Sequence, residues 1–357
     1  MNTKKDLDNF KTKFDKLVNA HKNRIIITAH INADDDAISS VLSMWYYLTK
    51  IKKVKNTIKI LYSNKKVDRW NNISFVENIE FVGEIYDYLE KTDLLIMLDC
   101  RGYHRISNNP KELQRLKLKT IVVDHHKTPA TEKYDLALEY TNISKSSNAE
   151  IMYSLFFSHL KKMDNGIAEV LLIGIYGDTG GFRFVTKNQS SAFLSAKQIL
   201  NKSNVKIDTV LAKLETYNVP QLKILSKFLE NIKVYKNNNW GSFSVSYITR
   251  EFANNFTNEQ ISNGKAIYGN YQKSIENSKW GLVIYPVMGN DLQWGLSFRS
   301  QPGHPNVRLI AQEFDTDGGG HDAAAGAKLV EKNLNEKIIL NKILKYLKNN
   351  DPIIIPS

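Results

Sequence analysis

The stretch Ile25-Ile-Ile-Thr-Ala-His30-Ile-Asn-Ala-Asp34-Asp-Asp36 determines the fold class that we predict for this chain. Its first four residues form a continuous apolar and β-branched run, which is typical of a strand buried on both faces of a parallel sheet. An imidazole and three carboxylates follow, and a helical pattern begins near residue 37. A buried strand, a polar loop and a helix in this order indicate a doubly wound α/β sheet.

Two further apolar runs, at residues 94–98 and 120–123, also end in ionisable side chains. Asp99 follows the first run, and Asp124-His125-His126 follows the second. Because the carboxyl ends of parallel strands meet at one edge of a sheet, we expect these side chains to share a crevice with the acidic loop after residue 29.

A fourth polar element follows two predicted helices at residues 147–163 and 165–178. The second helix leads into Gly174-Ile-Tyr-Gly-Asp178-Thr-Gly-Gly-Phe-Arg183, which places a carboxylate among glycines. We expect Asp178 to join the same crevice.

Each of these four elements also has an interpretation without chemistry. The acidic loop could cap the helix at 37–49, Asp99 could be a turn residue, the histidine pair could lie on a surface turn, and Asp178 could end a helix. All four alternatives would have to hold together, so we predict a metal site instead. Carboxylates and imidazoles without a thiolate suit Mn²⁺, Mg²⁺ or Co²⁺ better than structural zinc, and two neighbouring cations need one bridging carboxylate.

The length of 357 residues predicts two domains. We expect a doubly wound, mostly parallel α/β domain over residues 1–200, a helical linker over 201–235, and a smaller α+β domain over 236–357. The first domain opens with an amphipathic helix near residues 4–22. The last domain has strand-like and helical segments at 241–248, 257–269, 280–287, 292–299 and 333–347.

Composition points to a cytoplasmic protein without a membrane partner. The single cysteine, Cys100, cannot form an intramolecular disulfide, and we find neither a secretory signal nor an apolar run long enough to cross a membrane. The net charge of +12 is weak evidence for a polyanionic partner, because only nine of the 49 basic residues are arginine and lysine is spread along the chain. The sequence leaves a homodimer open.

The four polar elements together resemble the motifs of the DHH phosphoesterase superfamily. In the last domain, Gly318-Gly-Gly-His321-Asp-Ala-Ala-Ala-Gly326, with Ser297-Phe-Arg299 upstream, resembles the DHH-associated C-terminal domain. The order and spacing of these motifs are similar to those of the nanoRNase (oligoribonuclease) and pAp phosphatase subgroup over residues 24–330. The resemblance implies a hydrolase acting on phosphoric ester bonds.

The resemblance also implies a role for each motif residue. One Mn²⁺ would be held by His30, Asp34 and Asp99, and the other by Asp36, Asp99, His125 and Asp178, with Asp99 as the bridge. His126 would face the scissile phosphate or its leaving oxygen, and Asp124 would orient the histidines. A terminal phosphate of the substrate would be bound by Arg299, Gly318, Gly319, Gly320 and His321. The stretch Ser146-Ser-Asn-Ala-Glu150 resembles the family's Ser-Ser-Thr-Ala-Glu.

The implied substrates are short RNA oligonucleotides and 3′-phosphoadenosine 5′-phosphate (pAp), from which the 3′-phosphate would be removed. Cyclic di-AMP or its linear product pApA is the alternative. A non-catalytic nucleic-acid-binding module ranks lower, because no predicted ligand is missing. A family II inorganic pyrophosphatase ranks lower still, because it lacks the Gly-Gly-Gly-His signature.

Three positions of the first motif depart from the family pattern. This chain has Ala33, Asp35 and Ser39 where the family usually has proline, glycine and glycine. No predicted ligand is lost. Asp35 would either add negative charge near the metals or face solvent.

Overall fold

The computed structural model describes residues 4–21, 23–63, 68–90, 92–126, 134–272, 274–316 and 318–356. The chain divides into two compact units, Met1–Thr216 and Tyr217–Ser357. The division lies inside the segment 201–235 that the sequence predicts as a linker. Each unit has its own sheet and its own apolar core.

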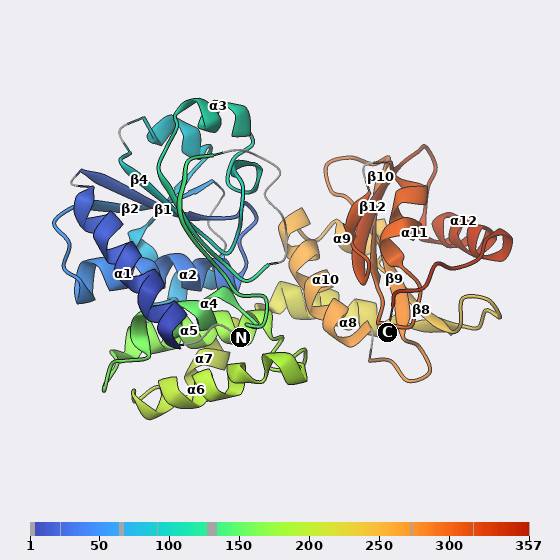
Figure 1. Ribbon diagram of the computed structural model, residues 1–357. Helices are drawn as coiled ribbons and strands as arrows, with labels where there is room; N and C mark the ends of the chain where they lie inside the picture. The colour runs from blue at the N-terminus through green and yellow to red at the C-terminus, as the bar shows by residue number, and fades with distance from the viewer. Residues whose placement is uncertain are drawn as a thin grey trace. The chain divides into compact units, whose positions relative to one another are not determined.

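The first unit is built on a six-stranded parallel sheet with the strand order β3-β2-β1-β4-β5-β6 (Figure 1). The strands are β1 Arg24–Ala29, β2 Thr57–Ser63, β3 Ile79–Val82, β4 Leu94–Leu98, β5 Thr120–Asp124 and β6 Leu136–Thr141. Every neighbouring pair is parallel. The predicted α/β fold class is therefore confirmed. The strands β2, β3 and β6 are not predicted from the sequence, because polar side chains interrupt their apolar runs.

Alternate residues of the central strands enter two different cores. Ile25 and Ile27 belong to a large core under the helices α1 (Lys4–Ala20), α2 (Asp35–Tyr46) and α5 (Asn165–Asp178). Ile26 belongs to a smaller core on the other face, which includes a residue of α3 (Pro110–Arg115). Because both faces are covered, the central strands are apolar throughout, as the sequence predicts.

Two helices of the large core, α2 and α4 (Asn148–Met152), each continue into a π-helical turn, and two more helices complete the first unit. The π-helical turn η1, Tyr47–Ile51, continues α2, and η6, Tyr153–Phe157, continues α4, so the helix predicted over 147–163 ends early. Gly174 lets α5 approach its neighbours, because a Cβ there would lie 2.6 Å from side-chain atoms of both Ser39 and Ala149. The helices α6, Ser191–Asn201, and α7, Ile207–Leu214, complete the unit.

The second unit has a six-stranded sheet with the order β11-β12-β10-β9-β8-β7. Its strands are β7 Lys233–Tyr235, β8 Phe243–Tyr247, β9 Trp280–Pro286, β10 Gln293–Arg299, β11 Gly319–His321 and β12 Ala324–Val330. The β8–β9 pair is parallel and the other pairs are antiparallel. The helices are α8 Val219–Glu230, α9 Arg250–Ala253, α10 Asn258–Gln272, α11 Val307–Phe314 and α12 Glu336–Asn349.

Helices cover both faces of this second sheet. Residues of α11 and α12 share one core with the strands. Ile224 and Phe228 of α8 join a separate core with α10 and Val283 of β9, and both α8 residues are fully buried. The helix α8, which lies within the predicted linker, is thus packed into the second unit.

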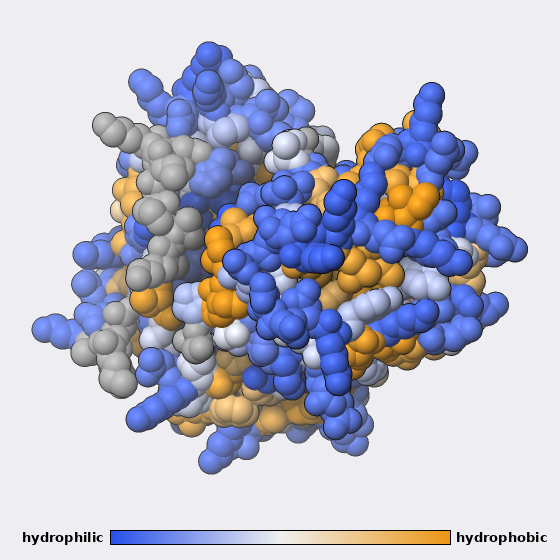
Figure 2. Space-filling view, turned by 90° about the vertical axis from the view of Figure 1, so that its right-hand side faces the viewer, coloured by the Kyte–Doolittle hydropathy of each residue, from blue (hydrophilic) through white to orange (hydrophobic). Residues whose placement is uncertain are grey.

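The surface is largely hydrophilic on the face drawn in Figure 2, with apolar residues in several separate places. Large apolar side chains that are mostly exposed include Val219, Val330 and Ile353. Among the described residues, we find no helix that is both long enough and apolar enough to cross a membrane.

Candidate metal centre

Strand register brings three of the predicted residues to one edge of the first sheet. In the parallel ladders, Ala29 pairs with Leu98, and Leu98 pairs with Val123. The residues that follow these partners, His30, Asp99 and Asp124, therefore emerge side by side at the carboxyl ends of the strands.

The acidic loop both caps a helix and contributes to the centre. Asp34 is the N-cap of α2, and its Oδ1 accepts hydrogen bonds from the backbone N–H groups of Asp36 (3.1 Å) and Ala37 (3.0 Å). Its Oδ2 lies 3.7 Å from His30 Nε2. The capping interpretation and the ligand interpretation are thus compatible, because each uses a different oxygen atom.

Two groups of potential ligands lie on either side of the Asp99 carboxylate. His30, Asp34 and Asp99 form one group, and Asp36, His125 and Asp178 form the other. A third group, Asp99, His125 and His126, overlaps both. Asp99 Oδ2 lies 3.4 Å from His30 Nε2, and Asp99 Oδ1 lies 3.2 Å from His125 Nε2. The carboxylate of Asp99 therefore lies between the two groups.

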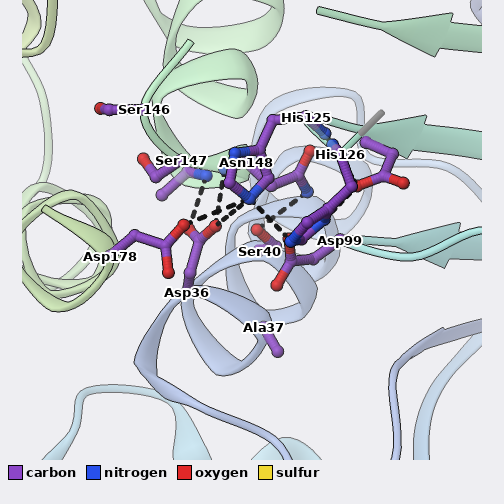
Figure 3. Close-up of polar contacts among 12 residues, drawn as sticks. Asp36, Ala37, Ser40, Asp99, His125, His126, Ser146, Ser147, Asn148 and Asp178 are labelled. Carbon is purple, nitrogen blue, oxygen red and sulfur yellow. Dashed lines mark hydrogen bonds and ion pairs between the residues drawn. The ribbon is translucent and has the colours of Figure 1, made fainter. Parts of the chain in front are cut away.

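Asp178 enters the centre from the last residue of α5. Its Oδ2 lies 3.2 Å from His125 Nε2, and Asp36 Oδ2 lies 3.8 Å from the same nitrogen. The Asp36 side chain is fully buried, and backbone N–H groups of Asn148 (2.6 Å) and Ala149 (2.8 Å) donate to its two oxygens (Figure 3).

The donor atoms fit divalent cations. Asp99 Oδ1 and His125 Nε2 are buried and lie 3.2 Å apart, but this contact lacks hydrogen-bond geometry, so neither atom has a hydrogen-bond partner within the described part of the chain. Buried polar atoms without partners are costly, so an ion that both atoms could ligate would remove that cost. Carboxylate oxygens mixed with imidazole nitrogens, without thiolate, suit Mn²⁺ or Mg²⁺.

The electrostatics of the cluster also favour added positive charge. Burial lowers the pKa of His125, but its contacts with Asp178 and Asp99 and the charge of Asp36 outweigh burial and raise that pKa to about 12. Burial and the neighbouring charges of Asp99 and Asp178 raise the pKa of Asp36 well above its ordinary value. Burial would raise the pKa of Asp99, but the contacts with His125 and His30 lower it overall. The closely spaced carboxylates of the cluster therefore favour a bound cation.

His126 lies at the exposed side of the centre. Its Nδ1 is 2.8 Å from Asp124 Oδ1 and 3.6 Å from Asp99 Oδ1, and about half of its side chain is exposed. Asp124 is buried and also accepts from the backbone N–H groups of His125 (2.8 Å) and His126 (3.1 Å). The carboxylate thus orients the imidazole of His126 but contacts His125 only through the backbone.

Comparison with known proteins agrees with this geometry. Residues 24–175 match the model of the DHH family, N-terminal domain. The predicted resemblance of the first unit to the DHH phosphoesterases is therefore confirmed. The probable bifunctional oligoribonuclease and PAP phosphatase NrnA of Streptococcus mutans is 25% identical over 331 residues, which cover 90% of this chain and 95% of that protein. The match confirms the predicted resemblance to this DHH subgroup.

Two more matches concern the fold and the alternative substrate. The crystal structure of an exopolyphosphatase-related protein from Bacteroides fragilis matches with a TM-score of 0.78 and 22% identity, and the match covers 96% of each chain. This match supports the fold. The cyclic-di-AMP phosphodiesterase PdeA of Listeria monocytogenes is 22% identical over 91% of this chain and 48% of its own length.

The residues predicted to bind the substrate lie in the second unit. Arg299 of β10 and His321 of β11 both pair with Ala324 of β12, one from each side. Directly paired residues of antiparallel strands point to the same face, so these two side chains share one face of the sheet. Arg299 Nη1 donates to Phe298 O (2.8 Å) and Ser297 Oγ (3.3 Å).

The glycine run before His321 has different requirements at each position. Gly320 has φ +133°, and a Cβ there would lie 2.4 Å from Ala324 O. A Cβ at Gly318 would lie 2.7 Å from Asp315 O, whereas a Cβ at Gly319 would meet nothing within 4 Å. Positions 318 and 320 therefore require glycine, because a Cβ at either position would lie too close to a backbone carbonyl oxygen.

The departures from the DHH pattern are accommodated by packing. Asp35 is buried, and its Oδ1 accepts a hydrogen bond from Trp70 Nε1 (3.1 Å), so the solvent-facing alternative is wrong. Ser39 Oγ donates to Val170 O (2.6 Å), which joins α2 to α5. Ala33 packs against the large core.

Sequence reasoning gave no role to Asn148 or Trp70. Neither residue type carries a signal for metal chemistry, and their partners in the centre are far away in the sequence. For the Ser146–Glu150 stretch, the sequence implies only by resemblance that a helix N-terminus can approach the site. Its N-cap serine, Ser147, is the local signal that a helix begins there.

Proposed function

We propose that this protein is a cytoplasmic, two-cation DHH phosphohydrolase that removes the 3′-phosphate from pAp and degrades short RNA oligonucleotides, with Mn²⁺ as the cation. The broader prediction of a hydrolase acting on phosphoric ester bonds is confirmed by the DHH family match and the phosphatase and phosphodiesterase names of the relatives. The observation that carries the proposal is the position of Asp99 between two groups of potential ligands.

Six side chains would hold the two cations. His30 and Asp34 would bind one, Asp36, His125 and Asp178 would bind the other, and Asp99 would bind both. Cations bound there would supply Lewis-acid activation of the phosphoric ester and of the attacking water.

His126 is proposed to act on the leaving group. Asp124 Oδ1 accepts the Nδ1–H of His126, which fixes the tautomer and leaves Nε2 directed away from that carboxylate. A protonated His126 would donate its Nε2 proton to the leaving oxygen as the P–O bond breaks.

Substrate selection is proposed to depend on the second unit. Arg299 and His321 share one sheet face, and the backbone around Gly318, Gly319 and Gly320 lacks the side chains that would obstruct an anion. These groups would bind a terminal phosphate. Recognition of a chain end would favour mononucleotides and short oligonucleotides over long RNA.

Hydrolysis of cyclic di-AMP or pApA remains the second candidate, because the similarity to PdeA of Listeria monocytogenes extends over 91% of this chain. The test is product release from pAp, a 5′-labelled RNA dinucleotide, pApA and cyclic di-AMP in parallel, with Mn²⁺ and with Asp99→Asn as the inactive control. Turnover of pAp and the RNA dinucleotide is the expected result. Turnover confined to pApA or cyclic di-AMP would favour the second candidate, and no turnover by folded, Mn²⁺-loaded protein would favour a binding module.

A further inference from the structure

We infer that Asn148 is a positioning residue of the metal centre, whose buried amide holds three ligand-bearing segments in place before any cation binds. Asn148 is the first residue of α4 and is fully buried. Figure 3 shows it between Asp36, Ser40 and Asp99. The inference rests on the proposed function, since it assumes that this centre binds Mn²⁺.

The neighbours of the Asn148 amide determine its orientation. The carbonyl oxygen of Val123 can only accept a hydrogen bond, and the backbone N–H of Asp99 can only donate one. The amide nitrogen therefore donates to Val123 O (3.1 Å), and the amide oxygen accepts from Asp99 N (3.2 Å) and Ser40 Oγ (3.0 Å). The N–H of Asp99 is shared between two acceptors, because it also donates to Val123 O (2.9 Å). One side chain thus joins the end of β4, the end of β5 and the helix α2.

The backbone of the same residue holds a fourth group. Asn148 N donates to Asp36 Oδ2, and the next N–H, of Ala149, donates to Asp36 Oδ1. Both oxygens of this buried ligand are therefore oriented by the start of α4. Through Val123, the side chain also contacts the strand that leads to His125 two residues later.

The ligand residues need this support because the backbone conformation of Asp99 and the negative charges of the carboxylates disfavour their close placement. Asp99 has φ +57°, a left-handed conformation that non-glycine residues seldom adopt unless their surroundings impose it. Asp36, Asp99 and Asp178 also bring three carboxylates within 3.8 Å, 3.2 Å and 3.2 Å of one atom, His125 Nε2. The hydrogen bond from Asp99 N to the Asn148 amide helps to hold the strained residue, and the backbone bonds hold Asp36.

The test is Mn²⁺ binding to EDTA-stripped protein by calorimetry, with Asn148→Ala as the variant and Asn78→Ala as the matched control. Asn78 makes the same kind of bond, from its amide nitrogen to Phe75 O (2.9 Å), but it lies outside the cluster of predicted ligands. Substitutions behind metal ligands typically cost about 10–100-fold in metal affinity. We expect a loss of that size for Asn148→Ala and none for the control.

A steady-state measurement separates positioning from a general loss of stability. For Asn148→Ala at saturating Mn²⁺, we expect a lower kcat for pAp with KM nearly unchanged, because the predicted substrate contacts lie elsewhere. If Asn148→Ala does not fold, Ser40→Ala removes one donor to the same amide, and a several-fold loss of Mn²⁺ affinity is the expected result.

The outcomes distinguish the inference from the proposed function. Folded Asn148→Ala that binds Mn²⁺ as tightly as the wild type would overturn the positioning role and leave the proposed function intact. Unchanged Mn²⁺ affinity in Ser40→Ala, where the first variant fails to fold, would overturn it equally. A wild-type protein that binds no Mn²⁺ would refute the proposed function, and the inference would fall with it.

Discussion

Replacing Asp99 with asparagine tests the bridging role of its carboxylate with little change in shape. Asp99 occupies a left-handed backbone conformation at φ +57°, which asparagine also tolerates, so Asn strains the backbone less than alanine would. The substitution keeps the volume and removes one negative charge. Effects on metal binding can therefore be attributed to the charge.

The size of the effect follows from the short distances around this carboxylate. Its oxygens lie 3.4 Å and 3.2 Å from the ring nitrogens of His30 and His125. At an effective dielectric constant of 20, one unit of opposite charge at such a distance contributes about 5 kcal/mol. Solvent relaxation will recover part of this energy, and a remaining loss of about 3–4 kcal/mol corresponds to a decrease in Mn²⁺ affinity of roughly 10²–10³-fold.

The assay is calorimetric titration of metal-free Asp99→Asn with Mn²⁺, together with phosphate release from pAp. We expect the affinity loss above and a fall in kcat/KM of about 10³-fold or more, because the bridging ligand contributes to both cation sites. Asp93→Asn is the matched control. Asp93 lies just before the opposite end of β4, and its carboxylate accepts from Asn23 N (2.9 Å) rather than from a potential metal ligand.

The reasoning would be refuted by a folded Asp99→Asn protein that binds two Mn²⁺ ions with wild-type affinity and retains turnover within tenfold of the wild type. That result would mean that the two groups of ligands do not depend on a shared carboxylate. Equal losses in Asp99→Asn and Asp93→Asn would instead indicate a general effect of charge removal.

Three further predictions test the second unit and the core. Arg299→Ala should raise KM for pAp by about 10–100-fold with kcat nearly unchanged, because it removes a charged hydrogen-bond donor, and steady-state kinetics would contradict this if kcat fell instead. Gly320→Ala should lower the free energy of unfolding by about 2 kcal/mol, because its Cβ would approach Ala324 O. Gly319→Ala should change the free energy of unfolding by less than about 0.5 kcal/mol, because its Cβ would meet nothing within 4 Å. Urea unfolding that shows equal losses of stability for the two variants would refute the difference. Burial, with the charge and hydrogen bond of Asp15, raises the pKa of Tyr47, so the folded protein keeps this phenol neutral while the unfolded chain ionises it above about pH 10. Above pH 10, the free energy of unfolding of the wild type should therefore fall by about 1.4 kcal/mol more per pH unit than that of Tyr47→Phe. If urea unfolding gives the two proteins the same dependence of unfolding free energy on pH, Tyr47 does not contribute.

The sequence by itself determined the fold class and the members of the predicted metal centre. Continuous apolar runs require burial on both faces, and a parallel sheet brings the ends of such strands to one edge. The side chains after each run, at His30, Asp99 and Asp124, could therefore be expected to meet. This part of the structure depends on local patterns, which a single sequence carries.

Only the tertiary structure decided how these groups are held. Asn148 and Asp36 are 112 positions apart, and nothing in either local sequence indicates that the backbone of one binds the carboxylate of the other. The strands β2, β3 and β6 have weak apolar patterns and are stabilised by pairing with stronger neighbours. The hydrogen bond between Asp35 and Trp70 likewise joins two segments whose local sequences give no sign of each other. Such contacts between distant segments form only once the chain has folded, so a local pattern cannot predict them.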